Sequence, residues 1–193
     1  MLFRSNFMAA KNSPHLELFR KKGTEVILMY DRVDEWLMAY MPEFEGKTFQ
    51  SISKGDLDVE ETEEEKKVQE EKTKDFDAIL KQIKEVLKDQ IEEVRLTNRL
   101  TDSPSCVVVD KDAMSMHLQR MIQMTGQAMP VAKPILELNP DHALVTRLKT
   151  EADDTVFADL TRLLFEQALL TEGGHLEDPT SFVKRMNRFL VSA

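Results

Sequence analysis

A strongly acidic tract divides the chain and limits where a hydrophobic core can form. Residues 56–75, DLDVEETEEEKKVQEEKTKD, hold ten acidic and four basic side chains, a net −6 of the chain's formal −9. A segment with so few apolar residues cannot bury enough surface to offset the entropy of ordering it. We therefore expect an acidic linker or frayed helix over 56–75, with an acidic interaction segment as the alternative. The remainder separates into residues 1–55 and 76–193.

The first part, residues 1–55, predicts an αβα unit. Pro14 suits the first position of a helix and Gly23 suits the left-handed residue that ends one. An apolar strand over 24–30, TEVILMY, and a second helix over 31–41, DRVDEWLMAYM, follow. Such a unit is too small to close a core comfortably, so it looks like the tail of a larger domain.

The second part, residues 76–193, predicts a small sheet with helices around it. Apolar residues recur at helical spacing from Phe76, and a later helix is expected to have Asn139 as its cap. Two more helices run from about Thr155 to Leu170 and from Pro179 nearly to the end. Three strand candidates, VRLTNRL, SCVVVD and KPILELN, lie between the helix that begins at Phe76 and the helix expected at Asn139. The predicted class is α+β: a remnant αβα unit, then a domain with a small sheet, several helices and a helical hairpin.

The composition excludes several classes of function. No apolar run reaches the length of a membrane span, and MLFRSNFMAAKNSP lacks the apolar core of a signal peptide, so no membrane association is expected and the predicted location is cytoplasmic. No broad basic face exists for nucleic acid. The single cysteine, Cys106, lies in an apolar run and is expected to be a buried, inert thiol.

Neither a catalytic nor a metal site is predicted. The four histidines are not at metal-ligand spacing with one another. The six glycines form no phosphate-binding loop, and no nucleophile elbow occurs. We therefore expect no enzyme and no cofactor in this chain.

The C-terminal hairpin has more apolar surface than one partner covers. Its first helix carries an apolar stripe on one side and Phe165 and Leu169 on nearly the opposite side. A helix that is apolar on two sides needs two packing partners. The sheet supplies one, and the other is either a second copy of the hairpin or another part of the same chain. The stripe comprises Val156, Leu160, Leu163, Leu164 and Leu170, and the second helix has Phe182, Val183, Met186, Phe189 and Leu190 on one face.

Residues 113–129, AMSMHLQRMIQMTGQAM, hold five of the eleven methionines. Leaving four large apolar side chains of this helix exposed forgoes about 6–12 kcal/mol, which rivals the stability of a whole domain at about 5–15 kcal/mol. The pattern alone favours a core helix unless exposure has a function. At 100° per residue, one face collects Met114, Leu118, Met121, Ile122, Ala128 and Met129, whereas Met116 lies among Ser115, Gln119, Gln123 and Gln127.

Several stretches together resemble one family. AAKNSPHLELFRKKG, DRVDEWL, FEGKTFQSISKGDLD, VRLTNRLTDSP, LELNPDH and LEDPTSFVKRMNRFL are similar to the ninety-kilodalton heat-shock protein chaperones in their bacterial form. The resemblance runs from about Ala9 to Ser192 and implies the end of a middle domain over 1–55 and the C-terminal dimerisation domain over 76–193. It implies a stress-response parent that binds ATP and Mg²⁺ in an N-terminal domain that has no counterpart here.

The resemblance also implies site residues and partners. The chain is expected to form a homodimer through the hairpin and to bind unfolded client proteins; its end, FLVSA, lacks the acidic tail that recruits co-chaperones. The alternative is a structural dimerisation module without client contact, in which the methionine-rich helix is packed. Separately, the alternative for Trp36 is a core residue. The implied dimer residues are Leu160, Leu163, Leu164, Phe182, Met186, Phe189 and Leu190. The implied client residues are Met114, Leu118, Met121, Ile122, Trp36 and Glu35, and Met116 on the polar side is expected to contribute little.

Overall fold

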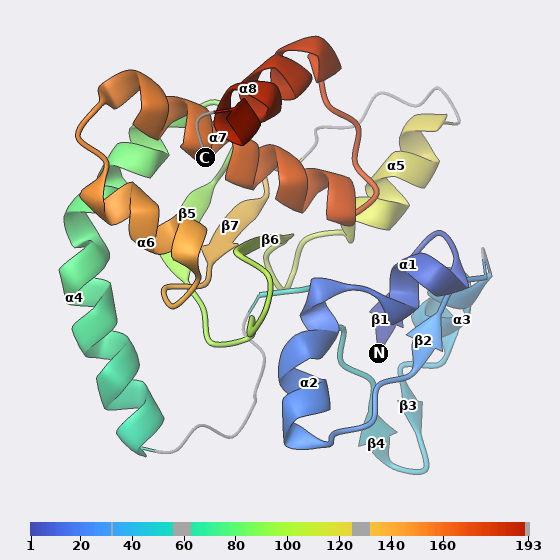
Figure 1. The fold of residues 1–193 in the computed structure, drawn as a ribbon. Helices are drawn as coiled ribbons and strands as arrows, with labels where there is room; N and C mark the ends of the chain where they lie inside the picture. The colour runs from blue at the N-terminus through green and yellow to red at the C-terminus, as the bar shows by residue number, and fades with distance from the viewer. Residues whose placement is uncertain (32, 56–62, 125–131, 192–193) are drawn as a thin grey trace.

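The computed structural model describes residues 1–31, 33–55, 63–124 and 132–191 (Figure 1). Helices alternate with short strands, and the predicted α+β class is confirmed. The N-terminal unit lies beside a larger part that is built around a three-stranded sheet (Figure 1).

The N-terminal unit is built from short elements around a small apolar cluster of Leu2, Leu16 and Ile52. The strands β1 and β2 are parallel, and β3 and β4 form an antiparallel pair. The helix predicted after Pro14 is a 3-10 turn that continues as α2, and Gly23 ends it with φ of +66°. The elements are β1 (Leu2–Phe3), α1 (Phe7–Lys11), η1 (Pro14–Leu16), α2 (Glu17–Lys22), β2 (Leu28–Met29), α3 (Asp34–Tyr40), β3 (Glu43–Phe44) and β4 (Lys47–Thr48).

The described part of the acidic tract is helical. The helix α4 spans Glu63–Val86 and so includes thirteen residues of the tract as well as the apolar stretch that follows it. Lys72 Nζ lies 2.6 Å from Asp141 Oδ1, and Lys149 Nζ lies 3.6 Å from Asp75 Oδ2. These ion pairs join the charged half of α4 to the segment around α6 (Ala143–Thr150).

The central sheet has the order β5 (Glu93–Leu96), β7 (Ile135–Leu138), β6 (Ser105–Val108). β7 pairs parallel with β5 and antiparallel with β6. All four residues of β7 are buried, as expected for a central strand covered on both faces. The helix α5 (Met116–Met124) lies in the connection between β6 and β7.

One face of the sheet packs against helices to form the main core. The long helix α7 (Asp154–Thr171) lies against β6, and α8 (Pro179–Val191) packs on α7. Leu136 and Leu138 of β7 belong to the same buried cluster as residues of α4, α6 and α7. The predicted hairpin is therefore present, and its first helix is a central element of the core (Figure 1).

One predicted helix cap is wrong. His142, not Asn139, is the N-cap of α6, and its Nδ1 accepts a hydrogen bond from Leu144 N at 3.2 Å. Asn139 instead accepts from Asp141 N and donates to Ser103 O. The Asn139 side chain is engaged in the turn between Asn139 and His142, so it does not cap the helix. The helix therefore begins later, at Ala143.

Candidate functional site

Two residues on the polar side of α5, Met116 and Gln119, contact other residues of the chain. Gln119 is only 9% exposed and donates a hydrogen bond from Nε2 to Met114 O at 2.7 Å. Met116 packs against the main core cluster. Among the described side chains of α5, Met116, on the polar side, therefore contacts the main core.

Three residues that the resemblance implied as client contacts, Met114 two positions before α5 and Leu118 and Ile122 within it, differ from Met116 in their packing. Met114, Leu118 and Ile122 are half-buried and belong to none of the buried clusters of the described residues. Because successive residues rotate by 100°, Leu118 and Ile122 project from sides of the helix other than the Met116 side. The side chain of Met121 and residues 125–129 lie outside the described part of the chain.

The helix α3 carries exposed apolar side chains. Trp36 is 60% exposed and Tyr40 is 84% exposed, and the nearby Val33 and Leu37 are also exposed. Trp36 is therefore not a core residue of this chain, although the side chain of its neighbour Glu35 is not among those described. Large apolar groups gathered on one face indicate an interaction surface.

The dimer residues implied by the resemblance divide into buried and exposed groups. Leu160, Leu163, Leu164 and Phe182 are at most 9% exposed within the single chain, and Met186 and Phe189 are half-buried. The second side of α7 is covered by α4, α6 and α8, so both of its apolar sides pack within the chain. Leu190 is 70% exposed and lies two turns after the exposed Val183 on the same side of α8, so that the two form an exposed apolar strip; Leu170 and Val191 are exposed as well.

Two ion pairs and a ring contact hold α8 in place. Arg185 pairs with Glu166, and Arg188 Nη1 lies 2.5 Å from Asp159 Oδ2. The guanidinium of Arg147 lies 5.2 Å from the centre of the Phe189 ring, a cation–π contact. These contacts orient the opposite, apolar side of α8, with Val183 and Leu190, toward solvent.

A buried ionic network, which the sequence analysis missed, joins the two parts of the chain. Glu172 at the end of α7 accepts hydrogen bonds from Arg4 Nη2 at 2.5 Å and from His15 Nε2 at 2.7 Å. His15 Nδ1 faces Arg99 Nη1 at 3.4 Å, which assigns the proton of the neutral ring to Nε2. Arg99 also donates to Ile52 O. The network therefore fixes the N-terminal unit against α7 and the sheet.

The network continues under the second face of the sheet. Glu137 of β7 is 2% exposed and accepts from Arg95 Nη2 at 2.8 Å and Arg99 Nε at 2.7 Å. Cys106 Sγ lies 3.7 Å from Glu137 Oε2, and burial together with this carboxylate raises the pKa of the thiol. One signal in the sequence could have indicated this network. Glu137 lies inside the apolar strand sequence ILEL, and a charged side chain in a buried strand needs an oppositely charged partner.

Burial controls the protonation of His15. Loss of hydration lowers its pKa, and the positive charges of Arg4 and Arg99 act in the same direction. The Glu172 carboxylate raises the pKa but does not outweigh burial. His15 is thus held as the neutral ring, consistent with its role as donor to Glu172 and acceptor from Arg99.

Glu17 forms a second contact between the two parts. Its carboxylate accepts from the backbone N–H groups of Thr101 and Asp102 at 2.6 and 2.8 Å and from the Ser103 hydroxyl. Burial raises the pKa of Glu17, but these hydrogen bonds outweigh it and the pKa is lowered overall. The loop before β6 is therefore held by one ionised side chain of α2.

Within the described ranges, no group of three histidine, cysteine, aspartate or glutamate side chains is placed to hold a metal ion. None of the helices found in those ranges has the length and apolarity needed to cross a membrane.

Comparison with known proteins identifies relatives over nearly the whole chain. The family model described as Hsp90 protein matches residues 3–193. Chaperone protein HtpG of Coxiella burnetii (strain RSA 493 / Nine Mile phase I) is 57% identical over 188 residues, which cover 97% of this chain and 30% of the relative. Chaperone protein HtpG of Legionella pneumophila (strain Paris) is 53% identical over 189 residues, covering 98% of this chain and 30% of the relative. The chain thus spans about 30% of the length of these relatives.

Proposed function

Because the chain belongs to the Hsp90 protein family, we propose that it joins two copies of an ATP-dependent chaperone and supplies part of the surface that holds unfolded client proteins. The relatives are named chaperones, and the chain matches under a third of their length. ATP and Mg²⁺ binding belong, in this proposal, to the parts of the relatives that the chain does not match, and the location is the cytoplasm.

The two-sided character of α5 carries the client-binding proposal. The side with Met116 and Gln119 is used for packing, so the helix does not need its other side to stay in place. Met114, Leu118 and Ile122 remain outside the buried clusters of the described residues. Flexible and polarisable methionines beside aliphatic side chains suit a surface that binds many unrelated sequences.

Exposed Trp36 supports a second client contact. Unfolded chains expose scattered apolar side chains, and an exposed tryptophan offers a large apolar face with a polar N–H group at its edge. We propose that α3 and α5 both contact clients, with Trp36 as the aromatic contact of α3.

The dimer contact is proposed on the exposed strip of the hairpin rather than on all seven residues that the resemblance implied. Leu160, Leu163, Leu164 and Phe182 support the hairpin from within. Val183, Leu190 and Leu170 are exposed apolar residues of two adjoining helices, and such a strip on two copies can pair with itself about a two-fold axis.

The runner-up is a structural dimerisation module in which α5 contacts no client. The two functions are separated by the double variant Leu118→Ser/Ile122→Ser, assayed for suppression of aggregation of a thermally unfolding protein. Loss of suppression with an intact fold and dimer supports client binding. Full suppression by the variant overturns it and leaves the structural module.

A further inference from the structure

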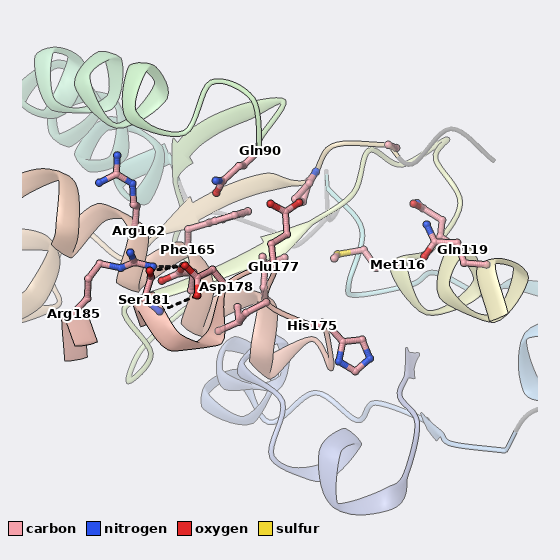
Figure 2. A pocket seen from close by; sticks show the side chains of 16 residues that line it. Gln90, Met116, Gln119, Arg162, Phe165, His175, Glu177, Asp178, Ser181 and Arg185 are labelled. Atoms are coloured by element: carbon pink, nitrogen blue, oxygen red, sulfur yellow. Dashed lines mark hydrogen bonds and ion pairs between the residues drawn. The ribbon is translucent and has the colours of Figure 1, made fainter. Parts of the chain in front are cut away.

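A cavity of about 400 Å³ lies between α5 and the α7–α8 hairpin. Figure 2 shows Met116 and Gln119 of α5 on one side, with Phe165, Ser181 and Arg185 of the hairpin on the other. Its volume falls within the range of about 300–1,000 Å³ that is typical of ligand pockets. The cavity is therefore large enough for a side chain together with its flanking peptide units.

The lining combines an apolar floor with amide side chains. Met116, Phe165, Leu169 and Pro134 contribute apolar atoms. Three glutamines, Gln90, Gln119 and Gln123, also line the cavity. A glutamine amide offers both a donor and an acceptor, the same pair of functions that a peptide unit presents.

The charged side chains at the cavity largely neutralise one another. Arg185 is paired with Glu166, and Asp178 accepts hydrogen bonds from the backbone N–H and the hydroxyl of Ser181. Two cationic side chains, Arg162 and Arg185, stand against three anionic ones, Glu166, Glu177 and Asp178. This near balance favours an uncharged ligand over a phosphate or a polycation.

The Arg185–Glu166 pair keeps unused hydrogen-bonding atoms. Glu166 Oε2 and Arg185 Nε are buried and have no hydrogen-bond partner among the described residues. Buried donors and acceptors are normally satisfied. A peptide unit entering beside the pair brings the N–H and the C=O that these two atoms lack.

We propose that this cavity is a client subsite for an extended, uncharged polypeptide segment, whose apolar side chain rests on Phe165 and Leu169 while its main chain pairs with Gln90 and Gln123. This inference rests on the proposed chaperone function and names the form of client that the chain recognises. The cavity uses the inward side of α5, so it is distinct from the outward contacts at Leu118 and Ile122.

The subsite stays open in the proposed dimer. Ser181 and Arg185 line the cavity, whereas Val183 and Leu190 form the exposed strip of α8. At 100° per residue around the helix axis, Val183 lies about 200° from Ser181, and Leu190 lies about 140° from Arg185. The cavity and the strip therefore lie on opposite sides of α8.

The test uses the 193-residue chain and a capped fluorescent peptide in which leucine alternates with serine, titrated by fluorescence anisotropy. Gln123→Trp and Gln90→Trp place an indole in the cavity from two different elements, and both positions are exposed, so the fold is retained. Gln82→Trp is the matched control, because Gln82 is an exposed glutamine of α4 outside the cavity lining. A peptide with aspartate in place of serine tests the preference for an uncharged segment.

We expect both cavity variants to raise the Kd of the Leu–Ser peptide about tenfold or more, with Gln82→Trp near wild type and the aspartate peptide binding more weakly. An unchanged Kd in both cavity variants, an equal loss in Gln82→Trp, or equal binding of the charged peptide overturns the inference. The proposed function is tested separately by Leu118→Ser/Ile122→Ser. If that variant loses aggregation suppression while the cavity variants bind normally, client binding by α5 stands and this subsite does not exist.

Discussion

His15 Nε2 donates to Glu172 Oε1 at 2.7 Å, across 157 residues of sequence. This contact, with Arg4 on the same oxygen, makes the end of α7 part of the attachment of the N-terminal unit. The hairpin helix that forms the core therefore also fixes the unit that presents Trp36. A change at Glu172 consequently affects both parts of the chain.

Glu172→Gln should destabilise the chain. The substitution leaves the buried Arg4 guanidinium without its anion, and breaking a buried pair in this way costs about 3–5 kcal/mol. Urea unfolding followed by far-UV circular dichroism measures the loss. Glu70→Gln, at an exposed position of α4, is the control and should stay within about 0.5 kcal/mol; equal losses in the two variants would contradict the role assigned to Glu172.

Stability should fall as the pH drops below the ordinary histidine value of 6.5. The folded state lowers the pKa of His15, so between the two pKa values the unfolded chain binds more protons, and stability therefore rises with pH in that window. The stabilisation is complete above the unfolded pKa. Urea titrations across this range measure the slope.

His15→Gln should flatten this pH dependence, because the glutamine amide does not titrate. His175→Gln, at an exposed histidine, should leave the slope as in wild type. A wild-type slope in His15→Gln would assign the pH dependence to another group.

Leu118→Ser/Ile122→Ser should weaken aggregation suppression while lowering stability by only about 1–2 kcal/mol, since both side chains are half-buried and their burial is incomplete. Met116→Ser should be more destabilising per residue, because Met116 packs against the main core. Differential scanning calorimetry and an aggregation assay on the same samples measure both effects. A larger fall per residue in the double variant would show that its face is core.

Leu190→Glu should yield a folded monomer. Leu190 is 70% exposed, so the charge is tolerated by the single chain but not in an apolar contact between two copies. Leu164→Glu should instead unfold the chain, because Leu164 is 1% exposed. Light scattering and circular dichroism separate the two results, and a persistent Leu190→Glu dimer would remove the exposed strip of the hairpin as the interface.

Cys106 should not react with thiol reagents in the native state. Its side chain is fully buried, and its pKa is raised by burial and by Glu137. The reagent therefore cannot reach the sulfur, and the reactive thiolate form is disfavoured. Labelling with a chromogenic disulfide should proceed only at the rate of unfolding and become fast in urea. Fast native labelling would contradict the buried network around Glu137.

Helices of the second part were predicted closely from the sequence. The helix expected from Thr155 to Leu170 spans Asp154–Thr171, and the one expected at Pro179 begins there. Apolar spacing and end signals such as Pro179 act within one element, so they can be read locally. The three strands of the sheet were found for a similar reason: SCVVVD and KPILELN contain short apolar runs, and VRLTNRL begins with alternating apolar and polar residues.

Strands of the first part were predicted less well. The run over 24–30 contributes only Leu28–Met29 to a strand. Its partner is the two-residue strand Leu2–Phe3, and the length of a strand is limited by what pairs with it. Pairing between segments so far apart is not visible in local composition.

The sequence by itself determined the α+β class and the two faces of α5, because periodicity and end signals are properties of single elements, and the resemblance of several long stretches indicated the family. Only the tertiary structure decided that Met116 and Gln119 face inward, that both apolar sides of α7 are covered within the chain, and that Glu172 holds Arg4 and His15. The physical reason is that burial and charge pairing depend on which distant elements meet, and a pattern within one helix gives its faces without giving their partners.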